Sequence, residues 1–336
     1  MKEYFAPLVL AAALAAQPAL AEPFRLIVSD LETPLVPNSV MDLALANGYF
    51  DRAGVEVELV RVQQTPMAMA ALQAGEGEMA NVSTDALLQL VARGATDLRA
   101  VTSPNKALPF LIAAAPGIAS PADLAGKSFG VGRVGSLDHS LSMKVLAAAG
   151  VATDELEIVS LGQPAVRAQA LMAGQVDATT MSVGTLMSLP ERDSVNVLID
   201  ADAYYKAAPV VTKVNAVTTE TLETRGAEVQ AVIEALTLAS RDFAADPALW
   251  VDRMVVARPD MARADLENLA EAYRQSWSVN GGLQEAELQA TTEWMYQSED
   301  FTGLRPVALE EWADLGPQQA VLAKIGPATG MDTPSQ

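Results

Sequence analysis

The spacing of hydrophobic and polar residues predicts alternating strands and helices along the first two thirds of the chain. Residues 55–60 alternate between apolar and acidic side chains, as expected for a strand with one buried face. Further strands are predicted at residues 24–28, 79–82, 98–102, 128–131, 156–160, 176–181 and 195–199. This strand–helix rhythm is typical of an α/β fold with a largely parallel sheet.

Helices are predicted between these strands, where good helix formers run up to a glycine that can end the helix. Residues 41–47, 67–74, 86–93, 137–149 and 166–173 fit this description. After residue 218 the chain is mainly helical, and one predicted helix face carries Val229, Val232, Ile233, Leu236 and Phe243. We therefore expect the C-terminal part to pack as amphipathic helices.

An internal repeat organises the first two thirds of the chain. Residues 72–80 align with residues 171–179 without a gap. Each copy holds the end of a helix, a glycine, an acidic residue and the start of a strand. A loop rich in Ser and Thr follows each copy, at residues 81–84 and 180–185. A helix–glycine–strand junction can recur by chance, but recurrence of the whole unit favours two similar α/β lobes.

The N-terminus has the features of a secretory signal peptide. Lys2 is followed by an almost wholly apolar run at residues 5–20, and Ala19–Ala21 has the small–x–small pattern of a cleavage site. The apolar run is too short for a membrane anchor and is interrupted by Pro18. We expect residues 1–21 to be removed and the mature chain to be exported to the periplasm in soluble form.

Charge and composition exclude several classes of function. Lys and Arg number 22 against 42 Asp and Glu, a net charge of −20, which disfavours nucleic acid and anionic lipid as partners. The chain has no cysteine, which rules out disulfides, iron–sulfur clusters, thiolate zinc sites and a lipoprotein anchor. With His139 as the single histidine, no metal and no cofactor are predicted.

Two local motifs are candidate sites of chemistry. Residues 130–135 match the G-x-G-x-x-G pattern, but the next predicted strand ends in Gly162–Gln163 and lacks the acidic residue of a dinucleotide site. The glycines are better explained by backbone approach to a small anion, with Ser136 adding a hydroxyl. His139 beside Asp138 does not indicate a hydrolase triad, because near neighbours on one helix cannot align its three members.

Several segments together resemble a known protein family. They are residues 48–59, 70–78, 170–178, 292–295, 306–307 and 311–312. They are similar to the periplasmic binding proteins for nitrate, sulfonates, taurine and thiamine-precursor pyrimidines. Yeast-type pyrimidine synthases share the fold but carry a cysteine-rich motif, which this chain lacks.

The resemblance implies a type II periplasmic binding protein fold. Each of its two lobes has a mostly parallel sheet flanked by helices, two crossovers join the lobes, and the ligand is clamped between them. We expect the first lobe to combine residues 22–104 and 216–336, and the second to span residues 105–215. The crossovers are expected near residues 103–109 and 204–214.

Candidate ligand-binding residues follow from the topology, because ligands of open α/β sheets bind beyond the carboxyl ends of the strands. The candidates are Asp30, Thr33, Gln64, Ser83, Thr84, Ser103, Arg133, Ser136, Gln163 and Ser182. Several loops lead into helix N-termini, which favour anions. Any one of the Ser, Thr or Asp residues could instead be an ordinary helix cap.

We therefore expect the exported substrate-binding component of an ABC importer, not an enzyme. Its ligand is expected to be a small organic anion such as a sulfonate, captured by hinge closure. Its partners would be the importer's membrane subunits, and the protein itself a monomer. The alternatives are a binding protein for a thiamine-precursor pyrimidine, a ligand-sensing module for a membrane receptor, and a secreted enzyme. The last is disfavoured because the chain lacks paired His, Cys or metal motifs.

Overall fold

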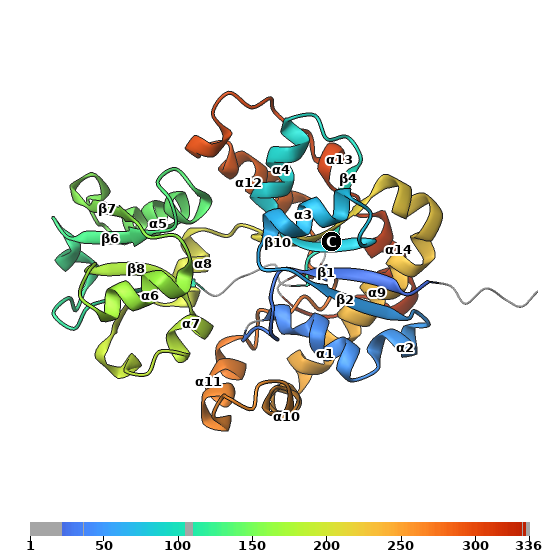
Figure 1. The fold of residues 1–336 in the computed structure, drawn as a ribbon, viewed down its shortest axis with the longest axis horizontal. Coiled ribbons are helices and arrows are strands. Elements are labelled where there is room, and N and C mark those ends of the chain that lie inside the picture. The colour runs from blue at the N-terminus through green and yellow to red at the C-terminus, as the bar shows by residue number, and fades with distance from the viewer. Residues whose placement is uncertain (1–21, 36, 105–109, 331, 334–336) are drawn as a thin grey trace, which may run out of the picture.

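Two five-stranded sheets are built from segments that interleave along the chain (Figure 1). The computed structural model describes residues 22–35, 37–104, 110–330 and 332–333. The first sheet has the order β2 (Val57–Arg61), β1 (Phe24–Val28), β3 (Met79–Ser83), β10 (Lys213–Thr218) and β4 (Leu98–Thr102). The second has the order β7 (Glu157–Ser160), β6 (Ser128–Val131), β8 (Ala178–Ser182), β5 (Phe110–Ala114) and β9 (Asn196–Ile199).

In each sheet four strands share one direction and one strand opposes them. In the first sheet β1 is parallel to β2 and β3, with Leu26 opposite both Leu59 and Met79, while β10 is antiparallel to β3 and β4. In the second, β6 is parallel to β7 and β8, while β5 is antiparallel to β8 and β9. The predicted α/β fold with two mostly parallel sheets is confirmed.

The two opposing strands are where the chain passes between the sheets. Strand β5 follows β4 of the first sheet, and β10 follows β9 of the second. Neither strand was predicted from the sequence. The expected boundary after residue 215 falls inside β10, whose residues Lys213–Asn215 pair with β3 in the first sheet, so this boundary is moved to before Lys213.

Fourteen α-helices and five short 3₁₀ helices are described in these ranges of the chain. The α-helices are α1 (Val40–Ala46), α2 (Tyr49–Ala53), α3 (Thr65–Gln73), α4 (Thr84–Ala92), α5 (Leu137–Ala148), α6 (Pro164–Met172), α7 (Val183–Met187), α8 (Ala201–Ala207), α9 (Thr219–Ala245), α10 (Pro247–Ala257), α11 (Arg263–Ala272), α12 (Glu285–Met295), α13 (Leu309–Trp312) and α14 (Gly316–Ile325). The 3₁₀ helices are η1 (Pro37–Ser39), η2 (Pro121–Leu124), η3 (Thr153–Glu155), η4 (Arg192–Ser194) and η5 (Glu299–Phe301). None of the helices described is long and apolar enough to cross a membrane. The predicted signal peptide, residues 1–21, lies outside the described residues.

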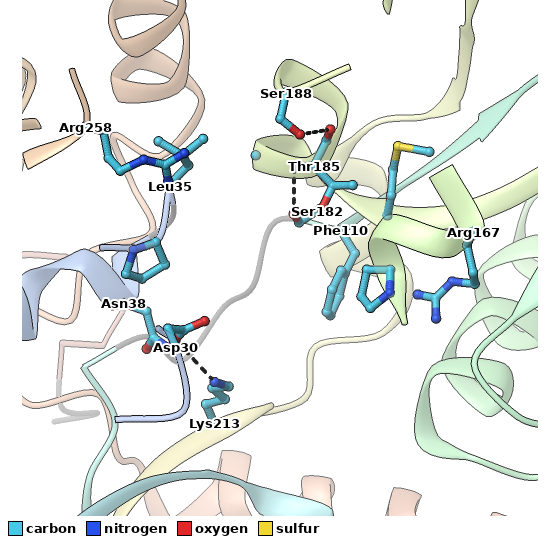
Figure 2. Close-up of a pocket in the computed structure, with 14 residues that line it drawn as sticks. Asp30, Leu35, Asn38, Phe110, Arg167, Ser182, Thr185, Ser188, Lys213 and Arg258 are labelled. Atoms are coloured by element: carbon cyan, nitrogen blue, oxygen red, sulfur yellow. Dashed lines mark hydrogen bonds and ion pairs between the residues drawn. The ribbon is translucent and has the colours of Figure 1, made fainter. Parts of the chain in front are cut away.

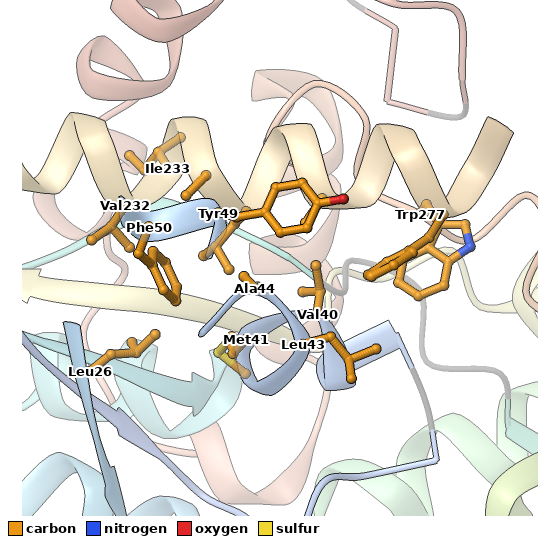
Figure 3. Close-up of a cluster of buried hydrophobic side chains, with 14 of the residues drawn as sticks. Leu26, Val40, Met41, Leu43, Ala44, Tyr49, Phe50, Val232, Ile233 and Trp277 are labelled. Carbon is orange, nitrogen blue, oxygen red and sulfur yellow. The ribbon is translucent and has the colours of Figure 1, made fainter. Parts of the chain in front are cut away.

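Both faces of the first sheet are covered by helices. Leu26 and Val28 of β1 point into one cluster with α1, α2 and α9, whereas Ile27 points into the other with α3 and α4, as the two-residue period of a strand requires. Figure 3 shows Phe50 of α2 between the sheet and Ile233 of α9. The predicted apolar stripe of α9 is buried along its length. We call this sheet with its helices α1–α4 and α9–α14 the first lobe.

The second sheet is covered by helices on both faces in the same way. Phe129 of β6 packs with Leu146 of α5 and Tyr204 of α8 on one face, and Leu171 of α6 packs with Met181 on the other. We call this sheet with α5–α8 the second lobe. The two lobes lie side by side along the long axis of the molecule (Figure 1).

The internal repeat has a structural cause in both lobes. The carboxylate of Glu78 accepts a bond from the backbone N–H of Arg25 (2.6 Å), and the carboxylate of Asp177 accepts one from the backbone N–H of Ser128 (2.9 Å). In each case the acidic residue at the turn before one strand fixes the start of the neighbouring parallel strand. The Ser128 hydroxyl also donates to Asp177 (2.7 Å), and these bonds lower the pKa of the Asp177 carboxyl.

We predict that Asp177→Asn lowers the free energy of unfolding by about 1 kcal/mol at neutral pH, because a charge-assisted pair of bonds becomes a neutral one. The contribution of Asp177 is present above its unfolded-state pKa and is lost as the pH falls through its lowered folded-state pKa. The difference between variant and parent should therefore vanish in acid. Urea unfolding at several pH values measures this, with the exposed Asp154→Asn as the control. An equal effect of both substitutions at neutral pH would contradict it.

Candidate functional site

A cavity of about 430 Å³ lies between the lobes and is lined by both (Figure 2). The first lobe contributes Asp30, Pro34, Leu35, Asn38, Lys213 and Arg258. The second contributes Phe110, Pro164, Arg167, Met181, Ser182, Gly184, Thr185 and Ser188. The lobes approach closely at one edge, where a Cβ on Gly184 would lie 3.1 Å from both the Cβ and the carbonyl oxygen of Leu35.

The first-lobe wall carries a buried lysine. Lys213 is the first residue of β10, and its Nζ donates to the hydroxyl of Ser29 (2.8 Å) and lies 4.0 Å from Oδ2 of Asp30. The Lys213 side chain is 17 % exposed, and burial lowers its pKa, against the opposing effect of Asp30. A loosely paired ammonium of this kind is suited to an anionic group in the cavity.

A row of asparagines and an arginine fix the rest of this wall. The Asn38 amide donates to Asn81 (3.1 Å), and the Asn81 amide donates to Asn215 (2.7 Å), which leaves the Asn38 side-chain oxygen without a partner. Arg258 donates to the carbonyl oxygen of Thr33 (3.0 Å) and pairs with Asp260 (2.7 Å). Arg258 thus holds the loop after β1 at the cavity while its charge is already compensated.

The second-lobe wall carries a buried guanidinium. Arg167 on α6 is only 5 % exposed. Its Nη1 donates to the carbonyl of Gly162 (2.8 Å), and its Nη2 donates to the carbonyl of Thr180 (3.3 Å). The same Nη1 lies 3.4 Å from the Asp138 carboxylate. Its Nε has no partner. Burial lowers the pKa of Arg167 and Asp138 acts in the opposite direction, but a guanidinium stays charged.

A recess of about 300 Å³ extends from this wall into the second lobe. Phe110, Pro164 and Arg167 line both spaces. The recess is also lined by Asp138, Gln163 and Tyr204, among others. Between them the cavity and the recess are lined by five charged residues: Asp30, Asp138, Arg167, Lys213 and Arg258.

Three of the ten predicted residues line these spaces. Asp30 and Ser182 line the cavity, and Gln163 lines the recess. Ser182 is also the N-cap of α7, where its hydroxyl accepts from the backbone N–H of Thr185 (3.0 Å). Both the ligand and the cap interpretation therefore stay open for Ser182.

The structure places the other seven predicted residues outside the lining of both spaces. In the first lobe, the Thr33 hydroxyl donates to Asp42, and the Ser103 hydroxyl donates to the carbonyl of Lys213 (2.6 Å). Gln64 is exposed just before α3, Ser83 directly precedes α4, and Thr84 is buried at the start of α4. In the second lobe, Arg133 pairs with Asp300 (2.7 Å), and the Ser136 hydroxyl donates to Asp138. Four of the seven, Thr33, Ser103, Arg133 and Ser136, thus have a structural partner.

The candidates from the sequence did not include Asn38, Arg167, Lys213 or Arg258, which line the cavity. An arginine in the first turn of α6 is a signal, since a cation is unfavourable near a helix N-terminus and calls for another reason to be there. Lys213 would have been found if β10 had been predicted, because it begins that strand at the cleft.

The histidine and the neighbouring serine bond to different groups. Nδ1 of His139 accepts from the backbone N–H of Gly135 (3.1 Å), while the hydroxyl of Ser136 donates to Asp138 and to the Arg133 carbonyl. His139 lines a separate pocket of about 260 Å³ with Trp294 of the first lobe. No group of three or more His, Asp or Glu side chains that could hold a metal ion occurs among the residues described.

Comparison with known proteins gives a family and a fold. The family model described as NMT1/THI5 like matches residues 40–249, more than half of the chain. Comparison with curated protein sequences gives no significant match.

Three solved structures illustrate the fold. The periplasmic aliphatic sulphonate binding protein SsuA from Escherichia coli is 18 % identical with a TM-score of 0.71, covering 87 % of this chain and 92 % of that one. The ligand binding component of an ABC-type import system from Staphylococcus aureus is 15 % identical with a TM-score of 0.71, covering 89 % and 98 %. The desulfurization enzyme DszB is 17 % identical with a TM-score of 0.65, covering 90 % and 99 %. The fold is therefore shared by binding proteins and by an enzyme.

We predict that Gly132→Ala lowers the free energy of unfolding by about 1–3 kcal/mol, the usual cost of overpacking. A Cβ there would lie 2.9 Å from Oδ1 of Asp138 and 3.2 Å from Nη1 of Arg167, so the ion pair beside the recess must shift. Gly117→Ala is the matched control, because a Cβ on Gly117 meets nothing within 4 Å. Urea unfolding of both variants is the measurement, and equal stability of the two would refute the close packing.

Proposed function

Because this chain belongs to the NMT1/THI5-like family, we propose that it is an exported solute-binding protein that captures a small organic anion for an ABC importer. The main support for this proposal is the cavity between the lobes, which has Lys213 on one wall and Arg167 on the other. A sulfonate is the ligand class we favour, since its oxygens accept hydrogen bonds from several donors at once. The sulfonate-binding protein among the structural neighbours is consistent with this choice.

We propose hinge closure as the mechanism of capture, about connections near residues 103–109 and 204–212. The first lobe would comprise residues 22–104 and 213–336, and the second the residues between them. Contacts between the lobes support a closed form: Arg192 of η4 pairs with Asp265 of α11 (2.5 Å), and Arg133 pairs with Asp300 (2.7 Å). We propose a periplasmic monomer that delivers its ligand to membrane subunits of the importer.

A binding role is favoured over an enzyme by the chemistry of the lining. The cavity and the recess contain Lys, Arg, Asp and hydroxyl groups, while the chain has no cysteine and its single histidine lies elsewhere. Recovery of an unchanged ligand after prolonged incubation with the protein tests this. A thiamine-precursor pyrimidine as ligand and a sensory role at a membrane receptor remain the competing proposals.

We predict that Lys213→Met weakens binding of pentane-1-sulfonate about ten- to a hundredfold, because a charged donor to the anion is lost. Isothermal titration calorimetry measures this, with Lys206→Met on the exposed side of α8 as the control. An unchanged dissociation constant for Lys213→Met would remove Lys213 from the site.

The same measurement has a pH signature. Burial lowers the pKa of Lys213 in the free protein, and a bound anion favours the charged form and raises that pKa again. Affinity of the parent should therefore be constant at low and neutral pH and fall as the pH rises through the lowered pKa of the free protein. The Lys213→Met variant should lack this alkaline decline.

We predict that Asp265→Asn weakens sulfonate binding about two- to fivefold without touching the cavity, because loss of the pair with Arg192 disfavours the closed form. Asp252→Asn is the control, since Asp252 pairs with Arg263 (2.7 Å) within the first lobe. Calorimetry together with small-angle scattering of free and ligand-saturated protein checks this. An unchanged radius of gyration on ligand binding would count against closure.

A further inference from the structure

The recess in the second lobe contains two buried donors that the protein leaves unused. Tyr204 of α8 is 3 % exposed, and its hydroxyl lies beside the hydroxyls of Ser142 and Thr180 without a hydrogen bond of good geometry to either; the Nε of Arg167 has no partner. The nearby hydroxyls of Ser142 and Thr180 bond to each other (2.7 Å). Buried donors without well-formed hydrogen bonds are uncommon and costly, which makes the residues that carry them candidates to bond a ligand atom in the recess.

Both donors stay in the donating state. Burial raises the pKa of Tyr204 above its usual range, so the hydroxyl keeps its proton. The ring of Tyr204 is fixed against Phe110, with ring centroids 5.8 Å apart. The Arg167 guanidinium is fixed by the carbonyls of Gly162 and Thr180. The two side chains that carry these donors are thus held in place before a ligand arrives.

The recess is also close to electrically neutral. The charge of Arg167 is compensated by Asp138 at 3.4 Å. The Asp138 carboxylate is in turn held by the backbone N–H of Gly132 (2.7 Å) and by the Ser136 hydroxyl, so it cannot turn away. A further negative charge buried here would lose its hydration without gaining a free counter-charge.

A cation with only loose compensation faces the cavity from the opposite wall. Lys213 lies 4.0 Å from Asp30, and in Figure 2 both stand across the cavity from Phe110 and Arg167. Between them the walls are apolar at Leu35 and Pro164. The anion site at Lys213 is therefore separate from the recess, which suits an uncharged hydrogen-bond acceptor.

We propose that the recess takes an uncharged hydrogen-bond acceptor of the ligand, such as a carbonyl oxygen, while the anionic group stays at Lys213. The protein then selects monoanions that carry an acceptor at the far end of an apolar spacer, and it rejects dianions of the same length. This inference rests on the proposed capture of an organic anion and adds the chemistry of the ligand's second end.

Three sulfonates of matched length test the selection. Pentane-1-sulfonate has no second polar group, 4-oxopentane-1-sulfonate carries an uncharged carbonyl, and 4-sulfobutanoate carries a second negative charge at the same carbon. We expect the ketone to bind about two- to tenfold more tightly than the alkane, the gain of one hydrogen bond. We expect the dianion to bind at least about tenfold more weakly than the ketone, because a second charge is desolvated.

The variant Tyr204→Phe tests whether the tighter binding of the ketone arises in the recess. It removes only a hydroxyl that makes no hydrogen bond of good geometry in the free protein, so the melting temperature should change little, while the ketone's advantage over the alkane should shrink. Tyr205→Phe, at the next position on α8 and outside the lining, is the control and should leave all three affinities as they are.

The outcomes separate the two proposals. Equal binding of the three sulfonates, or tightest binding of the dianion, would overturn the recess inference and leave anion capture standing. A ketone advantage that Tyr204→Phe does not change would also overturn it. Failure of all three to bind at millimolar concentration would overturn the proposed sulfonate class and the recess inference with it.

Discussion

The two strands that run against their sheets determine where the site lies. Strands β5 and β10 each complete the sheet opposite to the one the chain has just left, so each begins at the boundary between the lobes. Their first residues are Phe110 and Lys213, and both line the cavity. Because the strands are exchanged between the sheets, the topology places the Phe110 ring on one wall of the cavity and the Lys213 ammonium on the other.

The same exchange of strands explains which strands could be predicted from the sequence and which could not. Parallel strands flanked by helices leave a clear record in hydrophobic spacing and glycine stops, and those of both lobes were predicted within a few residues. Strand β5 is a uniformly apolar segment of five residues, and β10 begins within a segment expected to be a crossover. Pattern rules for strand–helix units do not apply to either strand, so both were missed.

The candidate site was predictable by place and less so by residue. The rule that ligands meet the carboxyl ends of strands led to Asp30, Gln163 and Ser182, which all line the cavity or the recess. Ser103 and Ser136 obeyed the same rule, yet they bond to Lys213 and Asp138 and so support the site from outside. Sequence spacing gives the loop but does not give the direction in which a hydroxyl points.

The net charge of −20 makes the local arrangement of donors decisive. A field of that sign disfavours the approach of an anion, but salt screens exposed charges beyond about 8–10 Å at physiological ionic strength. Buried groups such as Lys213 and Arg167 are screened much less and act at hydrogen-bond distance. Recognition of the proposed anion would therefore come from donors fixed before the ligand arrives, and the bonds of Arg167 to two backbone carbonyls and of Asp138 to Gly132 provide that rigidity.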